Sequence, residues 1–306
     1  GKPHAWMVLN RDNDTMVGVG LLVVKDFYID GKIVGVGSAR DLIIEKKHRT
    51  FWLAFKLEKE ILKQFAKYGI RFVFAKPGHD LVKNMFLRLG YKEIGEYVEY
   101  TKILKVSEIL KRKLPKLLRI GWFLKFLDKV SQLRDKLFLK DINHDYTVAF
   151  PDSFDKKFDR FNKEMAKYYR VLNINDSNYL NWKYIDNYTV KNKIFCLVDE
   201  AKEIKGYIVF SDADNRCSIK HLLVKPEDEM INILLFEFVK HVKNKGISKI
   251  GLRFMGTSKL SDNLKKFQFI ARKRKPQSIL INADDSFGNK DIIFDKQNWL
   301  LFCGDI

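Results

Sequence analysis

The feature that most constrains the fold of this chain is an internal repeat with an offset of about 178 residues. Each copy is predicted to contain a strand, a helix, a second strand and a second helix, and the two copies agree to within about two residues. The predicted elements are 38–45, 51–68, 71–75 and 80–89 in the first copy, and 216–225, 228–245, 248–254 and 258–267 in the second. Such self-similarity indicates duplicated units rather than one continuous sheet.

Alternating apolar and polar residues predict an antiparallel meander before the first copy and further elements around the second. Asp30-Gly31 supplies the turn signal of a hairpin in this meander. The further predicted strands are 5–9, 16–29, 33–45, 91–104, 193–199, 205–211, 278–282 and 298–303, and the further helices are 155–170 and 177–184.

Length and charge narrow the class of protein. The chain has 306 residues, of which 46% are hydrophobic, so it can form two domains with buried cores. Its net charge of +19 favours anionic partners such as nucleotide cofactors, phosphorylated substrates, acidic lipids or nucleic acid. Cys196, Cys217 and Cys303 lack the spacing of a disulfide framework or a zinc site, so no metal is expected.

The sequence also bears on localisation. No apolar run approaches the ~18 residues that cross a bilayer, and no signal peptide is recognised, which predicts a cytoplasmic protein. Because the chain enters a strand-like run directly after Gly1-Lys2-Pro3-His4, we expect the first domain to be truncated at its N-terminus.

Residues 102–140 differ in composition from the rest of the chain. They contain twelve Lys or Arg and three acidic residues, interleaved with apolar residues at helical spacing. Pro115 and Gly121 interrupt the helical pattern. The segment is predicted to be a basic amphipathic linker. It is also a candidate surface for an anionic membrane, with peripheral attachment to the inner face of the membrane as the alternative localisation.

The stretch from Asp41 to Ala54 resembles the acyl-CoA loop of the GNAT acyltransferase superfamily, in which a strand leads into an Arg-Gly-x-Gly-x-Gly/Ala loop and a helix. Arg49 and Ala54 match this pattern, whereas Thr50 and Trp52 replace glycines. The resemblance implies that the diphosphate of CoA binds at the helix N-terminus, where free N–H groups favour anions. The implied cofactor-binding residues are Ile43, Ile44, Arg49, Thr50, Phe51, Trp52, Leu53 and Ala54.

The resemblance also implies a general base and an acid. Asp41 and Glu45 are candidate bases, and because they are four residues apart in a predicted strand we expect them to share one face. Many family members place the acidic tyrosine at the position of Phe86, which has no hydroxyl. Tyr97 is the candidate acid, and the alternatives are Tyr100 and His79.

The second copy departs further from the family pattern. Glu227, Asp228 and Glu229 open its first helix and would repel a diphosphate, and Gln268 replaces the closing glycine. We therefore expect a structural or substrate-binding unit. His221 is either a residue of a site or a hydrogen-bonded core histidine.

Taken over most of its length, with Asn181–Tyr184 and Trp299–Asp305, the chain resembles tandem GNAT-like proteins associated with bacterial surface-polysaccharide synthesis. The implied fold class is α+β, with two GNAT-like domains, each a mixed, mostly antiparallel twisted sheet flanked by helices. The expected boundaries are 1–104, a basic linker at 105–145, and 146–306.

The implied function is transfer of an acyl group, most simply acetyl, from acetyl-CoA or another acyl-CoA to an amine or hydroxyl of a small or saccharide acceptor. Two alternatives stay open. One is aminoacyl transfer from charged tRNA, for which the basic surface is suited although nucleic acid is the less favoured partner. The other is a noncatalytic binding module.

Overall fold

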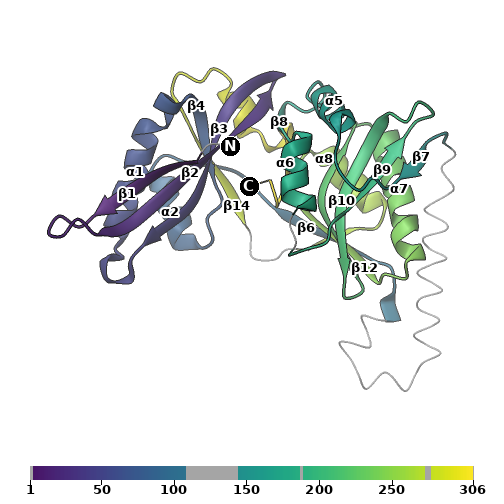
Figure 1. The fold of residues 1–306 in the computed structure, drawn as a ribbon, viewed down its shortest axis with the longest axis horizontal. Coiled ribbons are helices and arrows are strands. Elements are labelled where there is room, and N and C mark those ends of the chain that lie inside the picture. The colour runs from purple at the N-terminus through teal and green to yellow at the C-terminus, as the bar shows by residue number, and fades with distance from the viewer. Residues whose placement is uncertain (1–2, 108–143, 187–188, 273–276, 306) are drawn as a thin grey trace.

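A computed structural model describes residues 3–107, 144–186, 189–272 and 277–305 of the chain. They form a mixed, mostly antiparallel sheet with helices on its faces (Figure 1). We refer to residues 3–107 as the first unit and to residues 144–305 as the second unit. Most of the basic segment 102–140 lies outside the described residues, and so does its predicted membrane surface.

The first unit opens with an antiparallel meander. Asp30 and Gly31 both have positive φ, at 47° and 75°, which is the geometry of a tight hairpin turn and explains the sequence signal. The elements of this unit are β1 (Pro3–Leu9), β2 (Met16–Ile29), β3 (Lys32–Ile44), α1 (Phe51–Gln64), β4 (Ile70–Ala75), α2 (Asp80–Arg88), β5 (Lys92–Glu96) and β6 (Val98–Ile103).

Helix α1 follows the periodicity of its sequence. Leu57, Ile61 and the following Phe65 are buried in a core with residues of the sheet, while the opposite face carries charges. Burial of each such side chain contributes about 2 kcal/mol. Thr50 caps the helix N-terminus, and Gly69, with φ of 74°, ends the turn that follows the helix.

The second unit repeats this order and adds elements before and after it. Helix α7 is buried along most of its length in the largest hydrophobic core. The elements are β7 (Thr147–Ala149), α5 (Lys156–Met165), β8 (Val171–Asn173), α6 (Ser177–Leu180), β9 (Lys193–Val198), β10 (Ile204–Ala213), β11 (Arg216–Val224), α7 (Asp228–Asn244), β12 (Lys249–Gly256), α8 (Ser258–Lys266), β13 (Ile270–Arg272), β14 (Ser278–Ala283), α9 (Lys290–Phe294) and β15 (Trp299–Phe302). A π-helical turn at Asn181–Ile185 continues α6.

The two units exchange strands. Strand β6 of the first unit pairs with β12 and β13 of the second, and β14 of the second unit lies between β4 and β5 of the first. Neither unit therefore completes its sheet from its own segment of chain.

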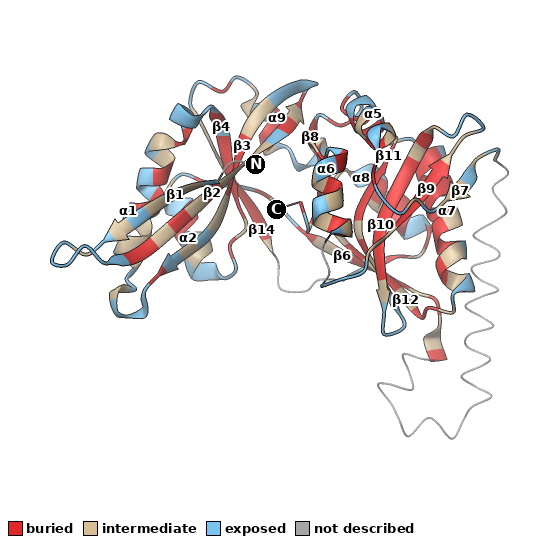
Figure 2. Cartoon of the chain, viewed as in Figure 1, coloured by how far each residue is buried: buried red, intermediate tan, exposed pale blue. Residues whose placement is uncertain are grey.

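A further connection runs through the middle of the molecule. Strand β15 pairs with β12 and, in parallel, with β8, which in turn pairs with β2. Trp299 is buried at this junction, edge-on to Phe27 and Phe72, and its indole N–H donates to the Ile293 carbonyl at 2.8 Å. Figure 2 shows the buried strands running through both units.

These pairings correct one expectation. The sequence predicted duplicated units rather than one continuous sheet, but in the described residues hydrogen bonds join the strands into one 15-stranded sheet. The α+β class and the order of the repeated strands and helices are confirmed. Strands β7 and β8 and helix α9, each of five residues or fewer, were not predicted. The expected boundaries at 104 and 146 stay a prediction.

Candidate functional site

Strands β3 and β4 pair in parallel and then diverge. Their register runs from Gly35 opposite Ile70 to Ser38 opposite Phe74, and no described residue of β4 pairs with β3 beyond that point. Strand β3 continues along β2 as far as Ile44. Beyond Ser38, strand β3 therefore runs along β2 toward the loop that precedes α1.

The loop between β3 and α1 presents backbone donors. Thr50 Oγ1 accepts the N–H of Leu53 at 3.2 Å, and the first bond to a backbone carbonyl within the helix is donated by Ala54. The N–H groups of Phe51 and Trp52 come before that bond and have no acceptor within the helix, as is usual at a helix start, so they can donate hydrogen bonds to an anion. Arg49 donates from Nε and Nη2 to the Ile44 carbonyl at 3.3 and 3.2 Å, which ties the loop to the end of β3.

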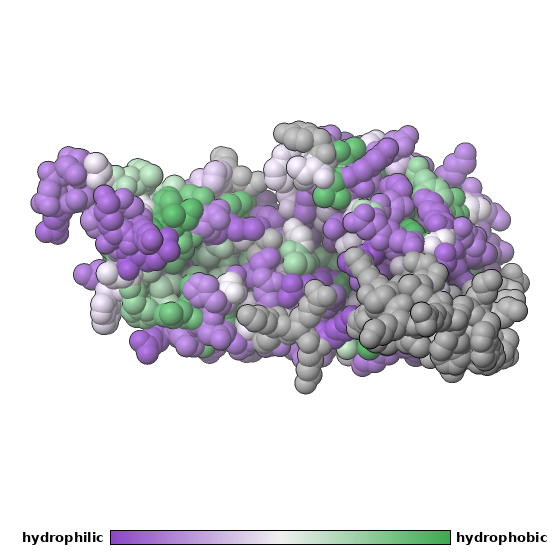
Figure 3. All heavy atoms as spheres, turned by 90° about the horizontal axis from the view of Figure 1, so that it is seen from below, coloured by the Kyte–Doolittle hydropathy of each residue, from purple (hydrophilic) through white to green (hydrophobic). Residues whose placement is uncertain are grey.

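Trp52, at the start of α1, lies exposed on the surface. Its side chain is 67% exposed and meets Phe51 and Phe55 edge-on at 5.9 Å. Ile43 at the end of β3 and Leu81 at the start of α2 are also exposed. Hydrophobic residues gather on the first-unit side of the face in Figure 3 (left in that view).

The two candidate bases do not share a face. Asp41 has φ of 41° and lies in a β-bulge, where Asp41 and Leu42 are together opposite Gly20. A bulge breaks the alternation on which the prediction depended. Both carboxylates are exposed, and Glu45, which follows the strand, lies 3.7 Å from Lys47 and from His48.

The tyrosine candidates lie elsewhere. Tyr97 is buried and donates from its hydroxyl to the Phe302 carbonyl at 3.2 Å. Burial raises the pKa of Tyr97 well above its ordinary value, and the nearby Asp305 raises it further. Tyr100 is buried and stacks on Phe254, whereas His79 is exposed.

Asp305, which was not among the predicted site residues, lies at the centre of the molecule, where the last described residues run between the units (Figure 1). Its Oδ2 accepts the Phe302 N–H at 2.7 Å, and its Oδ1 is 3.4 Å from Lys183 Nζ and 3.6 Å from His221 Nδ1. Burial opposes ionisation of Asp305, but the charge of Lys183 and the contacts with His221 and the Phe302 amide outweigh it and keep its pKa below the usual value.

Lys25 reaches the same centre from β2. Its Nζ donates to the Tyr179 hydroxyl at 2.9 Å and to the Asp305 carbonyl at 2.7 Å. Burial, followed by the charge of Lys183, lowers the pKa of Lys25 to about 8.

Three more cationic side chains surround this centre. Arg40 comes from the diverging end of β3, Lys76 directly follows β4, and Arg253 lies on β12. Burial lowers the pKa of Lys76, and the charges of Arg40 and Arg253 lower it further. We define the central cluster as Lys25, Arg40, Lys76, Lys183, His221, Arg253 and Asp305.

The corresponding divergence in the second unit is occupied by the protein itself. Strands β11 and β12 pair only as far as Ile219 and Leu252. Beyond them the Cys303 N–H donates to the Arg253 carbonyl at 3.2 Å, and Asp305 approaches His221 on β11. A pocket of about 430 Å³ is left beside this segment, lined partly by residues of β11 and β12.

The start of α7 carries its own acid, as the sequence indicated. Asp228 accepts from Asn263 at 2.9 Å and pairs with Lys266 at 3.4 Å. A carboxylate at this helix end disfavours a second anion there.

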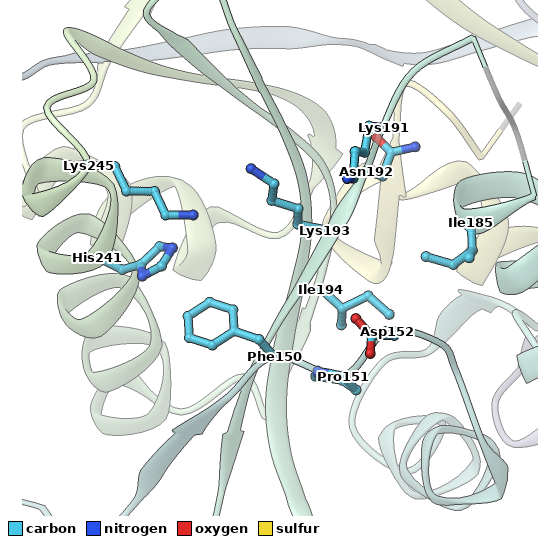
Figure 4. A pocket seen from close by; sticks show the side chains of 10 residues that line it. All are labelled: Phe150, Pro151, Asp152, Ile185, Lys191, Asn192, Lys193, Ile194, His241 and Lys245. Atoms are coloured by element: carbon cyan, nitrogen blue, oxygen red, sulfur yellow. The ribbon is translucent and has the colours of Figure 1, made fainter.

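Another pocket, of about 490 Å³, lies away from the centre in the second unit (Figure 4). His241 from α7 and Lys245, which directly follows α7, face Lys193 from β9, and the Phe150 ring lies tilted against His241 at a centroid distance of 4.6 Å. Asp212 contacts Lys193 at 2.5 Å and Lys245 at 3.9 Å, so it balances much of the positive charge. The remaining lining residues are Pro151, Asp152, Ile185, Lys191, Asn192 and Ile194.

None of the helices in the described ranges is long and apolar enough to cross a membrane. Within the same ranges, no group of three or more His, Cys, Asp or Glu side chains is arranged to hold a metal ion.

Comparisons with known proteins complete the description. No protein-family model matches the sequence, and no curated protein matches it. Among solved structures, a GCN5-related N-acetyltransferase from Anabaena variabilis matches with a TM-score of 0.64 and 11% identity over 91% of this chain and 62% of that one. A probable N-acyltransferase from Enterococcus faecalis matches with a TM-score of 0.62 and 11% identity over 89% and 60% of the two chains.

A third structure, N-myristoyltransferase from Saccharomyces cerevisiae with bound myristoyl-CoA, matches with a TM-score of 0.52 and 10% identity over 90% and 68% of the two chains. The chain thus spans about three fifths of the length of the Anabaena and Enterococcus proteins. At these identities the likeness concerns the fold. The chain has the fold of the GCN5-related N-acetyltransferases.

Proposed function

We propose that the protein is an acyltransferase that moves an acyl group, most simply acetyl, from an acyl-CoA to an amine or hydroxyl of a sugar-type acceptor. The observation that supports this proposal best is the divergence of β3 and β4 beside the open N-terminus of α1. It occurs in a fold shared with N-acetyltransferases and with a myristoyl-CoA-bound enzyme.

In this proposal the donor lies along β3. The diphosphate accepts hydrogen bonds from the N–H groups at the start of α1, and Arg49 and the preceding lysines supply positive charge. The pantetheine arm runs beside Ile43 and Ile44, along the part of β3 that extends past its pairing with β4. The loop positions Thr50 to Ala54 carry the remaining contacts, and the exposed Trp52 ring borders the site.

The chemistry needs a base for the attacking group and a proton for the leaving thiolate. We keep Tyr97 as the candidate acid. Its hydroxyl carries a proton at neutral pH, as an ordinary tyrosine does, and burial raises its pKa further. That hydroxyl donates to the Phe302 carbonyl, so acting as the acid requires this bond to be exchanged for one to the thiolate. Asp41 and Glu45 stay candidate bases. Their exposure allows them to act on an acceptor that approaches from solvent.

A pocket of about 630 Å³ between the units suits a sugar-type acceptor. The Tyr68 and Tyr179 rings and His4 offer apolar faces, while Asn173 and Asp176 offer hydrogen-bonding groups for hydroxyls. Lys25 lines the same pocket and belongs to the central cluster. In this proposal the second unit binds the acceptor. Residues 105–145 join the two domains. The protein works in the cytoplasm or at the inner face of the membrane.

The test measures the binding of CoA and of acetyl-CoA, both by calorimetry and by the shift in melting temperature. A ligand that binds only the folded chain raises its melting temperature. Arg49→Ala should weaken CoA binding, and Trp52→Gly should tighten it by removing a bulky ring from the loop. Lys59→Ala, which removes an exposed charge from the same helix, is the matched control.

Absence of a CoA response in the wild type and in both variants would remove the first unit as a cofactor site. Salt-sensitive retention on tRNA together with that silence would instead favour the tRNA-dependent alternative.

A further inference from the structure

The central cluster holds far more positive than negative charge. Five cationic side chains come from separate segments of both units, and two of them, Lys76 and Arg253, lie over the Tyr97 ring at 6.0 and 5.7 Å from its centroid. Carboxylates lie near them in three places: Asp305 contacts Lys183, Glu99 is opposite Arg253 on the paired strand β6, and Asp26 and Asp176 line the pocket beside Lys25. Lys183 pairs with Asp305 at 3.4 Å, and Lys25 bonds the Asp305 carbonyl, but no described carboxylate pairs with Arg40 or Lys76. Like charges gathered at half-buried positions repel one another and lose hydration, so the arrangement favours an anion from solution.

His221, which belongs to the cluster and faces Asp305 at 3.6 Å, and the neighbouring Tyr184 are buried with polar atoms that make no hydrogen bond among the described residues. These atoms are both ring nitrogens of His221 and the Tyr184 hydroxyl. His221 is 2% exposed and Tyr184 is 5% exposed. Buried polar groups of this kind usually bind a ligand or water.

The cluster is distinct from the predicted diphosphate site. Arg40 precedes Ile44 by four residues on β3, which in an extended strand separates them by about 13 Å. The helix N-terminus lies beyond Ile44, after a further turn of chain. One CoA diphosphate therefore cannot neutralise both places.

We propose that the central cluster binds an anionic group of the acceptor, a phosphate or a carboxylate, so that the substrate class is an anionic sugar-type molecule. Identifying the bound anion as part of the acceptor rests on the proposed function, whereas the anion site itself does not. Arg40 and Lys76 supply charge from the first unit and Lys25 and Lys183 complete the site from β2 and the second unit.

The experiment uses inorganic phosphate as the probe, with sodium chloride at equal ionic strength as the salt control. Phosphate should raise the melting temperature of the full chain in a saturable way. Arg40→Gln and Lys76→Gln should each weaken phosphate binding about tenfold, because each removes a charge-assisted contact. Arg11→Gln and Lys32→Gln, at exposed turn positions, should leave it unchanged.

Competition with CoA separates the two proposals. Saturating CoA should leave phosphate affinity unchanged, since the two anions occupy different places. Stabilisation by phosphate that chloride reproduces, retention of binding in both Gln variants, or displacement of phosphate by CoA would each overturn the anion-site proposal. A missing CoA response with intact phosphate binding would overturn only the acyltransferase proposal.

Discussion

Replacing Glu58 with glutamine should stabilise this protein above neutral pH and leave it nearly unchanged in mild acid. Glu58 lies on α1 with 2% of its surface exposed, in the core of the first unit. Its Oε1 accepts the Tyr91 hydroxyl at 2.8 Å, and it has no described cationic partner. Burial raises the pKa of Glu58 to about 7, although the Tyr91 hydrogen bond opposes the rise.

The magnitude follows from the difference between the folded and unfolded chain. The folded chain holds the proton to about pH 7, whereas the ordinary pKa of an exposed glutamate is 4.5. Between these values the folded state binds more protons, so the free energy of unfolding falls as pH rises, by about 3 kcal/mol, and stays low above the folded pKa. Glutamine keeps an acceptor for Tyr91 and carries no charge, so it should recover most of that free energy.

Urea unfolding of the wild type and of Glu58→Gln at about pH 5 and about pH 8 measures the effect directly. The variant should be more stable by about 2 to 3 kcal/mol at the higher pH only. Glu60→Gln, an exposed neighbour on the same helix, should show no such difference. Equal destabilisation of Glu58→Gln at both pH values would refute the assignment of a buried ionising carboxyl.

Three further outcomes follow from the described contacts. Asp305→Asn should lower the free energy of unfolding by about 3 kcal/mol in urea titrations, because it leaves the nearly buried Lys183 ammonium without its carboxylate. Thr50→Ala should cost about 1 kcal/mol in the same assay, because Leu53 loses its N-cap acceptor. Phosphate binding at the central cluster, measured by calorimetry, should weaken as pH rises through about 8, because Lys25 then loses its proton. The groups that face Lys25 are Lys183, Arg40, Tyr179 and Asp305. Lys25→Met should remove this pH dependence.

Local patterns in the sequence were sufficient for much of the fold. The sequence predicted a helix over 51–68, where α1 and the turn that follows it are found, and Asp30-Gly31 marked the hairpin. These features depend on residues within one or two turns of chain, where periodicity and turn chemistry act. The repeat itself came from comparing such local patterns at a fixed offset.

The exchange of strands could not be predicted in this way. Strand β14 reads as an ordinary apolar strand, and nothing in its residues identifies β4 and β5 as its neighbours. The bulge at Asp41 was missed because an aspartate in a strand pattern does not by itself signal positive φ.

The central cluster was missed for a related reason. Lys25, Lys183 and Asp305 come from three distant segments, and each alone reads as a solvated charge. Lys183 and Asp305 lay within stretches singled out for their resemblance to tandem proteins, but the sequence did not connect them. His221 was singled out, and only the structure places it beside Asp305.

The place of β14 between β4 and β5 has a consequence for synthesis on the ribosome. Residues 70–96 are synthesised nearly 200 positions before Ser278–Ala283. Until β14 has been synthesised, the edges of β4 and β5 that pair with it have no partner strand. Exposed strand edges invite pairing with other chains. A second chain of the same sequence, emerging nearby, could donate its own copy of β14, and yield of monomer should therefore fall when many ribosomes translate one message at once.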